Sequence, residues 1–324
     1  MAETVLDVKN LQVKFRVSKT ETITAIQDVT FSVKKGETLG IVGESGCGKS
    51  VTANTILRLL PEKTTIISGG SILFEGQDLT KLSLKEMRKV RGNKISMIFQ
   101  EPMTSLNPVY RIGDQLVEMY QANSTISKRE AWKKAKSMLE KVGIPSPEQR
   151  MHEFPHNLSG GMRQRVMIAM ALSSQPALLI ADEPTTALDV TIQAQVLELM
   201  RELQTQMNTA ILLITHDMGV VAENADYVMV MYAGEVVEYG SARSIFKDCR
   251  HPYTKGLLES IPRLDQDMDE LSTIEGTVPS LMQMPKGCRF SNRCKHCMDR
   301  CKEEEPALRE LEEGHQVRCF LYEP

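Results

Sequence analysis

The chain has 324 residues, of which 41% are hydrophobic and 25% charged, the usual proportions of a soluble globular protein. This length accommodates one large domain and one smaller one. A net charge of −3 argues against a general attraction to nucleic acid, and no apolar run approaches the roughly 18 residues of a membrane span. Residues 1–7 lack the basic and apolar parts of a secretion signal. We therefore expect a cytosolic protein whose cysteines are thiols or metal ligands rather than disulfides.

The first elements are predicted to be strands. Residues 5–33 alternate apolar and polar side chains, the period of two that indicates half-buried antiparallel strands. Phe15 belongs to this pattern and could either stack on a nucleotide base or pack as a core aromatic. Residues 38–42 form an apolar run that predicts a buried strand, and residues 49–60 have helical periodicity that stops at Pro61.

Between that strand and that helix lies a match to the phosphate-binding pattern G-x-x-x-x-G-K-[ST]. Its residues are Gly43, Glu44, Ser45, Gly46, Cys47, Gly48, Lys49 and Ser50. Glycines let successive N–H groups turn inward towards phosphate oxygens. Lys49 adds a positive charge for the β- and γ-phosphates, and the Ser50 hydroxyl is the expected Mg²⁺ ligand. Cys47 lies inside the loop, so alkylation of its thiol is expected to block nucleotide binding, with ATP protecting it.

Further strands are predicted at residues 72–74 and 95–99. Gln100 ends the second of these, the position at which α/β folds place functional groups. Residues 111–174 are predicted to be helical, with a capping box at residues 127–130 and a helix C-cap at Gly143. Ser159, Gly160 and Gly161 then stand at a helix start, where free N–H groups, the helix dipole and a hydroxyl make an anion site. The chain thus contains a second phosphate-binding device.

A further apolar strand, at residues 177–181, ends in two carboxylates. Asp182 suits a role of reaching Mg²⁺ through water, and Glu183 is placed to orient and deprotonate an attacking water. A helix is predicted over residues 190–208 and a buried strand over 210–214. His216 follows that strand, and a structural role and a role at the γ-phosphate are both open for it. After strands at 227–231 and 235–239 the α/β pattern ends at residue 240.

Over residues 1–240 these motifs resemble the nucleotide-binding subunits of ABC transporters, in the family's order. They are Walker A at Gly43–Ser50, the Q-loop Gln100, the signature at residues 158–165 with Ser159, Gly160, Gly161 and Gln164, Walker B ending in Asp182, the catalytic Glu183, the D-loop at residues 187–189 with Asp189, and the H-loop His216. The family's base-stacking aromatic falls on Phe15, and Ser50, Gln100 and Asp182 would surround Mg²⁺.

The resemblance implies an α/β P-loop NTPase fold with a RecA-like core, an antiparallel β subdomain and a helical subdomain over about residues 101–165. It also implies a composite site: ATP on Walker A of one subunit is covered by the signature helix of another. The partners would be a second ATPase subunit, either a paralogue or a second copy, and two transmembrane permease subunits that receive peptide from an extracytoplasmic binding protein. The expected place is the cytoplasmic face of the cell membrane.

The remaining residues, 241–324, are expected to form a small Cys-rich domain. Residues 251–258 and then 261–264 are similar to ATPases of dipeptide and oligopeptide importers and of nickel importers. The spacing of Cys288, Cys294, Cys301 and Cys319 looks like the motif that holds a [4Fe-4S] cluster in the peptide branch. Several thiolates in a short polar tail suggest metal on chemistry alone. Zinc is the alternative, with Cys294 and Cys297 as a C-x2-C pair completed by Cys288, Cys301 or His315.

The favoured function is ATP hydrolysis that powers peptide import. The alternatives are the ATPase of a nickel or metallophore importer and a non-transport ABC ATPase. The last class would be expected to show a long coiled-coil insertion or two nucleotide domains in one chain, and the sequence shows neither. It also shows no basic stripe for nucleic acid.

Overall fold

The computed structural model describes residues 3–100, 105–186, 188–261 and 273–323. It consists of two compact units. The first comprises Met1–Val5, Lys34–Glu37 and Leu82–Leu212, and the second comprises Leu6–Val33, Thr38–Lys81 and Leu213–Pro324. No helix among the described residues is long and apolar enough to cross a membrane.

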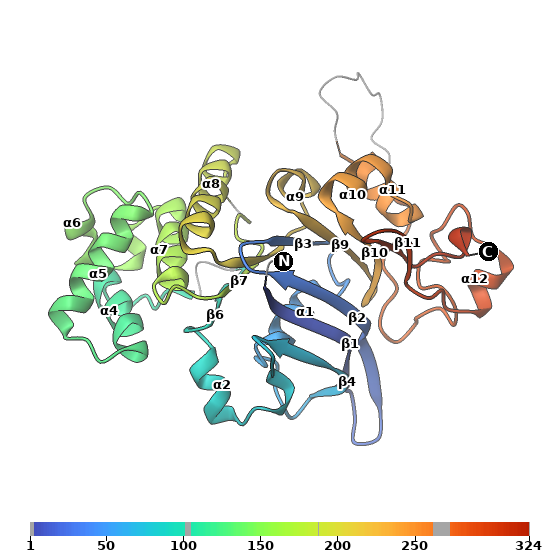
Figure 1. Ribbon diagram of the computed structural model, residues 1–324, viewed down its shortest axis with the longest axis horizontal. Helices are drawn as coiled ribbons and strands as arrows, with labels where there is room; N and C mark the ends of the chain where they lie inside the picture. Colours follow the sequence, from blue (N-terminus) through green and yellow to red (C-terminus); the bar gives the residue numbers. More distant parts are fainter. Residues whose placement is uncertain (1–2, 101–104, 187, 262–272, 324) are drawn as a thin grey trace. The chain divides into compact units, whose positions relative to one another are not determined.

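The second unit contains an antiparallel sheet with the strand order β2-β1-β4-β5, of which β1, β2 and β4 are labelled in Figure 1. Its strands are β1 (Thr4–Arg16), β2 (Thr22–Lys34), β4 (Thr65–Phe74) and β5 (Gln77–Asp78). Leu6 and Val8 of β1 are fully buried, as are Leu11 and Val13, each pair two residues apart as the pattern predicts, and a register shift against β4 between Lys9 and Gln12 separates the two pairs. The antiparallel strands predicted over residues 5–33 are therefore confirmed.

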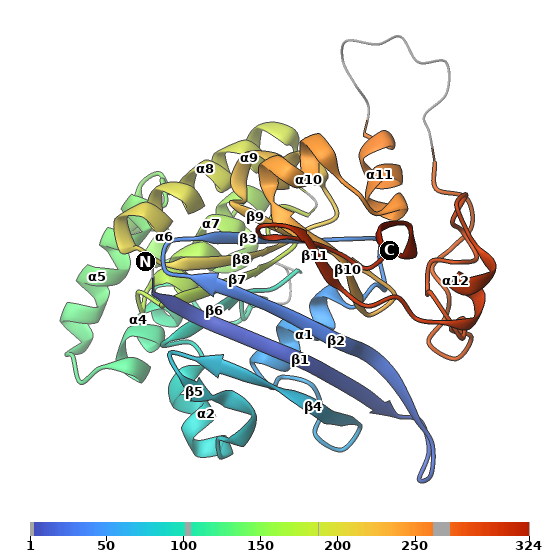
Figure 2. The same ribbon diagram turned by 45° about the vertical axis from the view of Figure 1, so that its right-hand side comes forward.

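A further set of strands in this unit carries the phosphate-binding loop. Strand β3 (Thr38–Val42) pairs in parallel with β9 (Tyr227–Tyr232), and β9 pairs antiparallel with β10 (Glu235–Ser241). Two strands from the end of the chain, β12 (His315–Val317) and β11 (Arg309–Glu312), continue beyond β10 (Figure 2). All five residues of β3 are buried, so the loop that follows Val42 starts from a fixed point.

The helices of the second unit are α1 (Lys49–Ile56), α9 (Met218–Asn224), α10 (Ala242–Asp248), α11 (Pro252–Glu259) and α12 (Asp299–Glu303). Helix α1 is shorter than the predicted 49–60. Arg58 has a left-handed backbone (φ 49°), and the Leu59 N–H donates to the Asn54 carbonyl at 2.8 Å. This C-terminal capping ends the helix before Pro61 is reached.

In the first unit, β6 (Ile95–Ile98) pairs in parallel with β7 (Leu178–Asp182). The helices are α2 (Leu84–Val90), α4 (Ile112–Asn123), α5 (Lys128–Lys141), α6 (Pro147–Met151), α7 (Gly160–Leu172) and α8 (Val190–Met207). Strand β8 (Ala210–Ile214) carries the chain from the first unit into the second.

The region predicted to be helical over residues 111–174 contains α4 to α7 (Figure 1). The predicted capping box is present at the start of α5: Ser127 Oγ accepts from the Glu130 N–H, and the Glu130 carboxylate accepts from the Ser127 N–H. An equivalent pair, Ser83 and Glu86, starts α2 and was missed by the sequence analysis. The first residues of the proposed helical subdomain, 101–104, lie outside the described part of the chain.

Aromatic packing fixes the C-terminal segment, which we define as residues 273–323, on the second unit. Tyr232 of β9, Tyr253 of α11 and Phe290 of the segment lie with ring centroids 4.7 to 5.4 Å apart. All three side chains are buried. Burying a large aromatic side chain contributes about 1.5 to 3 kcal/mol, so this cluster holds the segment against β9, directly beside the turn into β10.

Candidate functional site

The phosphate-binding loop has a backbone that only glycine can adopt at two positions. Gly43 has φ 149° and Gly48 has φ 105°. A Cβ on Gly43 would stand 2.2 Å from the Met231 carbonyl oxygen, and one on Gly48 would stand 2.6 Å from Ile26. The loop therefore curls tightly against β9, as a cradle for phosphate requires.

Lys49 begins α1, and its amine turns back into this loop. The Nζ donates to the carbonyl oxygens of Gly43 at 2.6 Å and Glu44 at 3.1 Å. The other end of the loop is fixed because the Gly234 N–H, in the turn between β9 and β10, donates to the Cys47 carbonyl at 2.8 Å. The structure thus confirms the predicted sequence of strand, loop and helix and shows what holds the loop in shape.

Cys47 is fully buried within the loop. Burial raises the pKa of its thiol, and the nearby Lys49 amine only partly offsets that effect. The species that reacts with alkylating agents is the thiolate. A buried, protonated Cys47 should therefore resist alkylation, which argues against the expectation that alkylation of Cys47 blocks nucleotide binding.

We expect maleimide to leave Cys47 unmodified in the folded protein, because the thiol is both buried and protonated. Cys297 lies nearer the surface and serves as the reactive control. Peptide mass spectrometry after brief treatment is the measurement. Rapid labelling of Cys47, slowed by ATP, would restore the original expectation.

The first unit brings Gln100 and Glu183 together at the carboxyl ends of β6 and β7. The Gln100 side chain donates to Glu183 Oε2 at 3.0 Å, and Thr186 Oγ1 donates to the same oxygen at 2.9 Å. Asp182, the last residue of β7, is buried. The pair of carboxylates therefore has one member inside the fold and one held at its edge.

Glu183 also has a left-handed backbone, with φ 48°. Such a conformation is uncommon and costly for a side chain of this kind, and strained backbones of this type are enriched at active sites. Thr186 was missed by the sequence analysis. The signal that could have found it is a hydroxyl three residues after the carboxylate, within one tight turn closed by the Thr186 N–H on the Glu183 carbonyl.

The predicted anion site at residues 159–161 is the N-terminus of α7. Ser159 is the N-cap, and its Oγ accepts from the Met162 N–H at 3.3 Å. A Cβ on Gly160 would meet nothing within 4 Å, whereas one on Gly161 would stand 2.9 Å from Ile192 of α8. Ser159 and Gly160 are exposed, so the N-terminus of α7 lies at the surface of the first unit.

Two other signature residues have internal contacts. Gln164 is 1% exposed, and its amide donates to the Pro184 carbonyl, just after Glu183. Arg165 donates to the Val142 carbonyl and to Gln195, each at 2.8 Å. Gln164 thus supports the Glu183 loop from within, and its part in nucleotide binding stays a prediction.

The other predicted site residues lie at element ends. Asp189 is the N-cap of α8, where its carboxylate accepts from the Ile192 N–H at 3.0 Å. Residue 187 of the D-loop lies outside the described residues. Phe15 is half-buried on β1, and His216 is exposed between β8 and α9. The structure places these residues without assigning them a ligand.

Glu44 of the loop is held by residues that the sequence analysis did not select. Its N–H donates to the Tyr253 hydroxyl at 2.9 Å, and its carboxylate accepts two hydrogen bonds from Arg293 at 2.6 and 3.1 Å. Tyr253 lies within the motif at residues 251–258, which resembles peptide-importer ATPases, but the motif gave it no role. Nothing in the sequence linked Arg293 to the loop.

Four cysteines of the C-terminal segment, Cys288, Cys294, Cys301 and Cys319, line one small cavity, and Cys297 does not. Burial raises the pKa of Cys288 to about 12 and that of Cys319 to about 11. As placed, no group of three or more His, Cys, Asp or Glu side chains in the described residues forms a metal site. The four thiols are therefore gathered, but not at the distances of bound ligands.

Comparison with protein families gives two matches. The model for the ABC transporter family matches residues 26–186, and the model for the oligopeptide/dipeptide transporter C-terminal region matches residues 237–301. Among solved structures, a dimeric structure of MJ0796, a bacterial ABC transporter cassette, has a TM-score of 0.65 and 28% identity, covering 74% of this chain and 99% of its own. The cbiO1 protein from Clostridium perfringens has a TM-score of 0.64 and 28% identity, covering 76% and 92%.

Two similar proteins extend over nearly the whole chain. The oligopeptide transport ATP-binding protein AppD of Bacillus subtilis (strain 168) is 53% identical over 320 residues, which cover 99% of this chain and 97% of AppD. The oligopeptide transport ATP-binding protein OppD of Escherichia coli (strain K12) is 50% identical over 319 residues, covering 98% and 94%. The phosphate-binding loop, the carboxylates after β7 and these matches agree, and the chain belongs to the ABC transporter ATPases that carry the oligopeptide/dipeptide transporter C-terminal region.

Proposed function

We propose that this ABC ATPase powers the import of di- or oligopeptides through partner permease subunits, at the cytoplasmic face of the cell membrane. Two findings support this most. One chain matches both family models, and its relatives are about half identical to it over nearly their whole length. Those relatives are described as oligopeptide transport proteins. We also propose the division of the chain at residue 240.

In the proposed reaction, the loop N–H groups and Lys49 bind the phosphates of ATP, and Phe15 stacks on the base. A Cβ on Gly43 would clash with the Met231 carbonyl, so the tight curve of this loop depends on glycine, which fits a loop shaped for phosphate. Ser50, Gln100 and Asp182 would hold Mg²⁺, which neutralises charge developing on the phosphates.

Glu183 is the proposed general base. Gln100 and Thr186 both donate to its Oε2, which orients the carboxylate for accepting a proton from water. Asp189 and His216 complete the proposed γ-phosphate environment.

The site is proposed to be completed by a second ATPase subunit, whose Ser159, Gly160 and Gly161 equivalents cap the nucleotide, with Gln164 supporting that helix start. Exposure of Ser159 and Gly160 supports this, since an anion site turned outward suits a ligand bound to another subunit. The similar MJ0796 cassette is described as dimeric. Both a paralogous partner and a second copy of this chain are compatible with the proposal.

Pull-down of the tagged full chain from detergent-solubilised membranes tests the function. We expect two multi-spanning permease subunits to co-purify, and we expect ATP hydrolysis by the reconstituted complex to rise when a peptide-loaded binding protein is added. Stimulation by a nickel chelate instead of peptide would move the assignment to a metallophore importer. Recovery without any membrane partner would overturn the transport function.

We further propose that Cys288, Cys294, Cys301 and Cys319 hold a [4Fe-4S] cluster, with Zn²⁺ as the alternative metal. The lining of one cavity by these four thiols supports this ligand set over one that includes Cys297. Four thiolates suit either group. Metal binding would displace the thiol protons and add stability to a segment with little core of its own.

Anaerobic purification with iron, sulfide and zinc analysis distinguishes these possibilities. We expect brown protein with iron and sulfide, lost in Cys319→Ser and retained in the matched control Cys297→Ser. Colourless protein with stoichiometric zinc would replace the cluster by zinc. Protein with neither metal would overturn both assignments.

A further inference from the structure

The C-terminal segment reaches the phosphate-binding loop through the side chain of Arg293. Its two terminal nitrogens donate to the two carboxylate oxygens of Glu44, at 2.6 and 3.1 Å. The Arg293 side chain is only 4% exposed and that of Glu44 is 33% exposed. A bidentate, largely buried ion pair of this kind fixes the orientation of the Glu44 carboxylate as well as its distance from the guanidinium.

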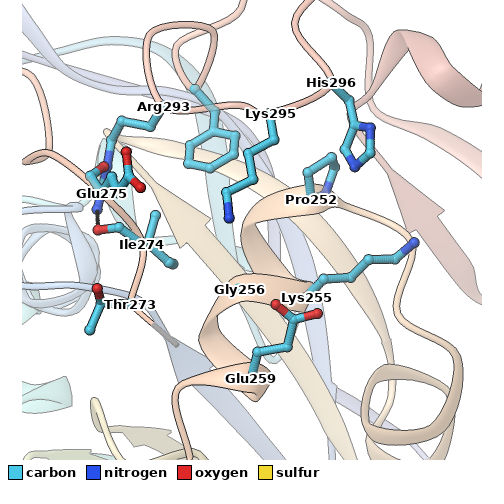
Figure 3. Close-up of a pocket in the computed structure, with 11 residues that line it drawn as sticks. Pro252, Lys255, Gly256, Glu259, Thr273, Ile274, Glu275, Arg293, Lys295 and His296 are labelled. Atoms are coloured by element: carbon cyan, nitrogen blue, oxygen red, sulfur yellow. Dashed lines mark hydrogen bonds between the residues drawn. The ribbon is translucent and has the colours of Figure 1, made fainter. Parts of the chain in front are cut away.

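Arg293 is itself held from behind. Its Nε donates to the Glu275 carbonyl at 2.8 Å, and Nη2 also donates to the Ile274 carbonyl at 3.1 Å. Figure 3 shows its guanidinium against this backbone, at the edge of a cavity also lined by Lys295 and His296. The guanidinium also lies 5.8 Å from the centre of the Tyr232 ring. Arg293 therefore has its geometry set within the segment and β9.

Tyr253 holds the same loop residue by its backbone. Its hydroxyl accepts a hydrogen bond from the Glu44 N–H at 2.9 Å, while its ring packs against both Tyr232 and Phe290. Burial raises the pKa of this phenol, so the hydroxyl remains neutral. Glu44 is thus fixed at its backbone and at its side chain by residues 209 and 249 positions further along the chain.

These contacts act on the part of the loop that holds Lys49, because Lys49 Nζ donates to the carbonyls of Gly43 and Glu44. A loop that is already ordered loses less conformational entropy when it binds phosphate, which strengthens binding. We infer that Arg293 and Tyr253 are positioning residues for the phosphate-binding loop and that ATP affinity depends on the docked C-terminal segment. By linkage, ATP should in turn strengthen docking of the segment.

The inference rests on the proposed binding of ATP by this loop. The experiment therefore uses separate variants to test ATP binding by the loop and the positioning role of Arg293 and Tyr253. The dissociation constant for Mg-ATP is measured on the full chain without turnover. Lys49→Ala tests the loop, whereas Arg293→Lys and Tyr253→Phe test the positioning residues without changing net charge. Lys286→Gln, which removes an exposed pair with Glu303, is the matched control in the same segment.

We expect Lys49→Ala to abolish detectable binding and Lys286→Gln to leave it unchanged. Arg293→Lys and Tyr253→Phe should each weaken ATP binding about three- to tenfold, the scale for groups that must now be ordered on binding. The KM for ATP should rise by a similar factor while kcat at saturating ATP is retained. Arg293→Gln, which also leaves Glu44 unpaired near the phosphates, should be weaker still.

Hydrogen exchange gives a second readout. In the wild-type protein, Mg-ATP should slow amide exchange in residues 252–260 and 289–293. The inference is overturned if both charge-conserving variants bind ATP like the wild type, with metal content and melting temperature showing an intact segment. If the Arg293 variants do not fold, the affinity of Tyr253→Phe decides. Normal ATP binding by Lys49→Ala would instead overturn the proposed role of the loop.

Discussion

Replacing Glu183 by Gln is expected to lower steady-state ATP hydrolysis by at least about a hundredfold, the contribution usual for a general base. Glutamine has the same shape and keeps an oxygen that can accept the hydrogen bonds from Gln100 and Thr186. What it lacks is the basicity to take a proton from water. Affinity for Mg-ATP should therefore stay within about twofold of the wild type, because binding needs no proton transfer.

The measurement combines phosphate release with equilibrium ATP binding on the same preparation. Glu202→Gln, an equally conservative change on the exposed face of α8, is the matched control and should hydrolyse ATP normally. Thr186→Val should produce a smaller loss, since it removes one of the two donors that orient the carboxylate. Wild-type turnover by Glu183→Gln would exclude Glu183 as the base.

Replacing Arg289 by Met is expected to lower the free energy of unfolding by about 3 to 5 kcal/mol, the cost of leaving a buried charge without its partner. Arg289 and Glu235 are 6% and 5% exposed at their side chains, and Arg289 Nε lies 3.1 Å from a Glu235 oxygen. Arg289 also donates to the Ala233 carbonyl and, at 2.6 Å, to the Gln27 side chain. One substitution thus removes one of the links between the C-terminal segment, β2 and the β9–β10 turn.

The loss should depend on pH in a definite direction. Burial already raises the pKa of Glu235, against the opposing effect of Arg289 and Arg318. Without Arg289 the folded-state pKa rises further, so the folded state binds the proton more strongly than the unfolded state does. Stability of Arg289→Met should then fall as pH increases, and the difference from wild type should be smaller near pH ~5 than near pH ~8.

Denaturant unfolding of the full chain at both pH values tests this. The double variant Arg289→Met, Glu235→Gln should recover much of the lost stability, because no uncompensated charge is left. Arg300→Met is the control and should cost far less, because the Arg300 side chain is 47% exposed and its buried partner Glu323 keeps a second ion pair with Arg309. If Arg289→Met and Arg300→Met lowered the free energy of unfolding equally, burial of the Arg289–Glu235 pair would be unimportant.

Local pattern was enough to predict the elements that carry the site. The loop at residues 43–50 was recognised because glycine spacing and the adjoining periodicities are imposed by the backbone itself. The carboxylates after β7 were found because apolar strands end where polar groups begin. The contact that orients the Glu183 carboxylate could not be predicted in this way. Thr186 reaches that carboxylate because the Glu183 backbone is left-handed, and a sequence pattern does not show the sign of φ.

Long-range contacts were the part that sequence could not provide. Tyr253 and Arg293 reach Glu44 across more than two hundred residues, and their spacing has no period. Arg289 looked like any other charge in a polar tail until its burial was known. Strands β11 and β12 were missed because they contain only four and three residues, too few for an alternating pattern to stand out from the turns around them.

Those two short strands also bear on aggregation. Without them, β10 would present a row of unpaired N–H and C=O groups, a template on which another chain could add a strand. Strand β12 covers that row, with Glu238 opposite Val317 and Tyr239 opposite Gln316. The outermost strand is then β11, four residues long and carrying Arg309, Glu310 and Glu312. A short, charged edge is a poor template for pairing, so β11 and β12 protect this edge of the sheet from pairing with other chains.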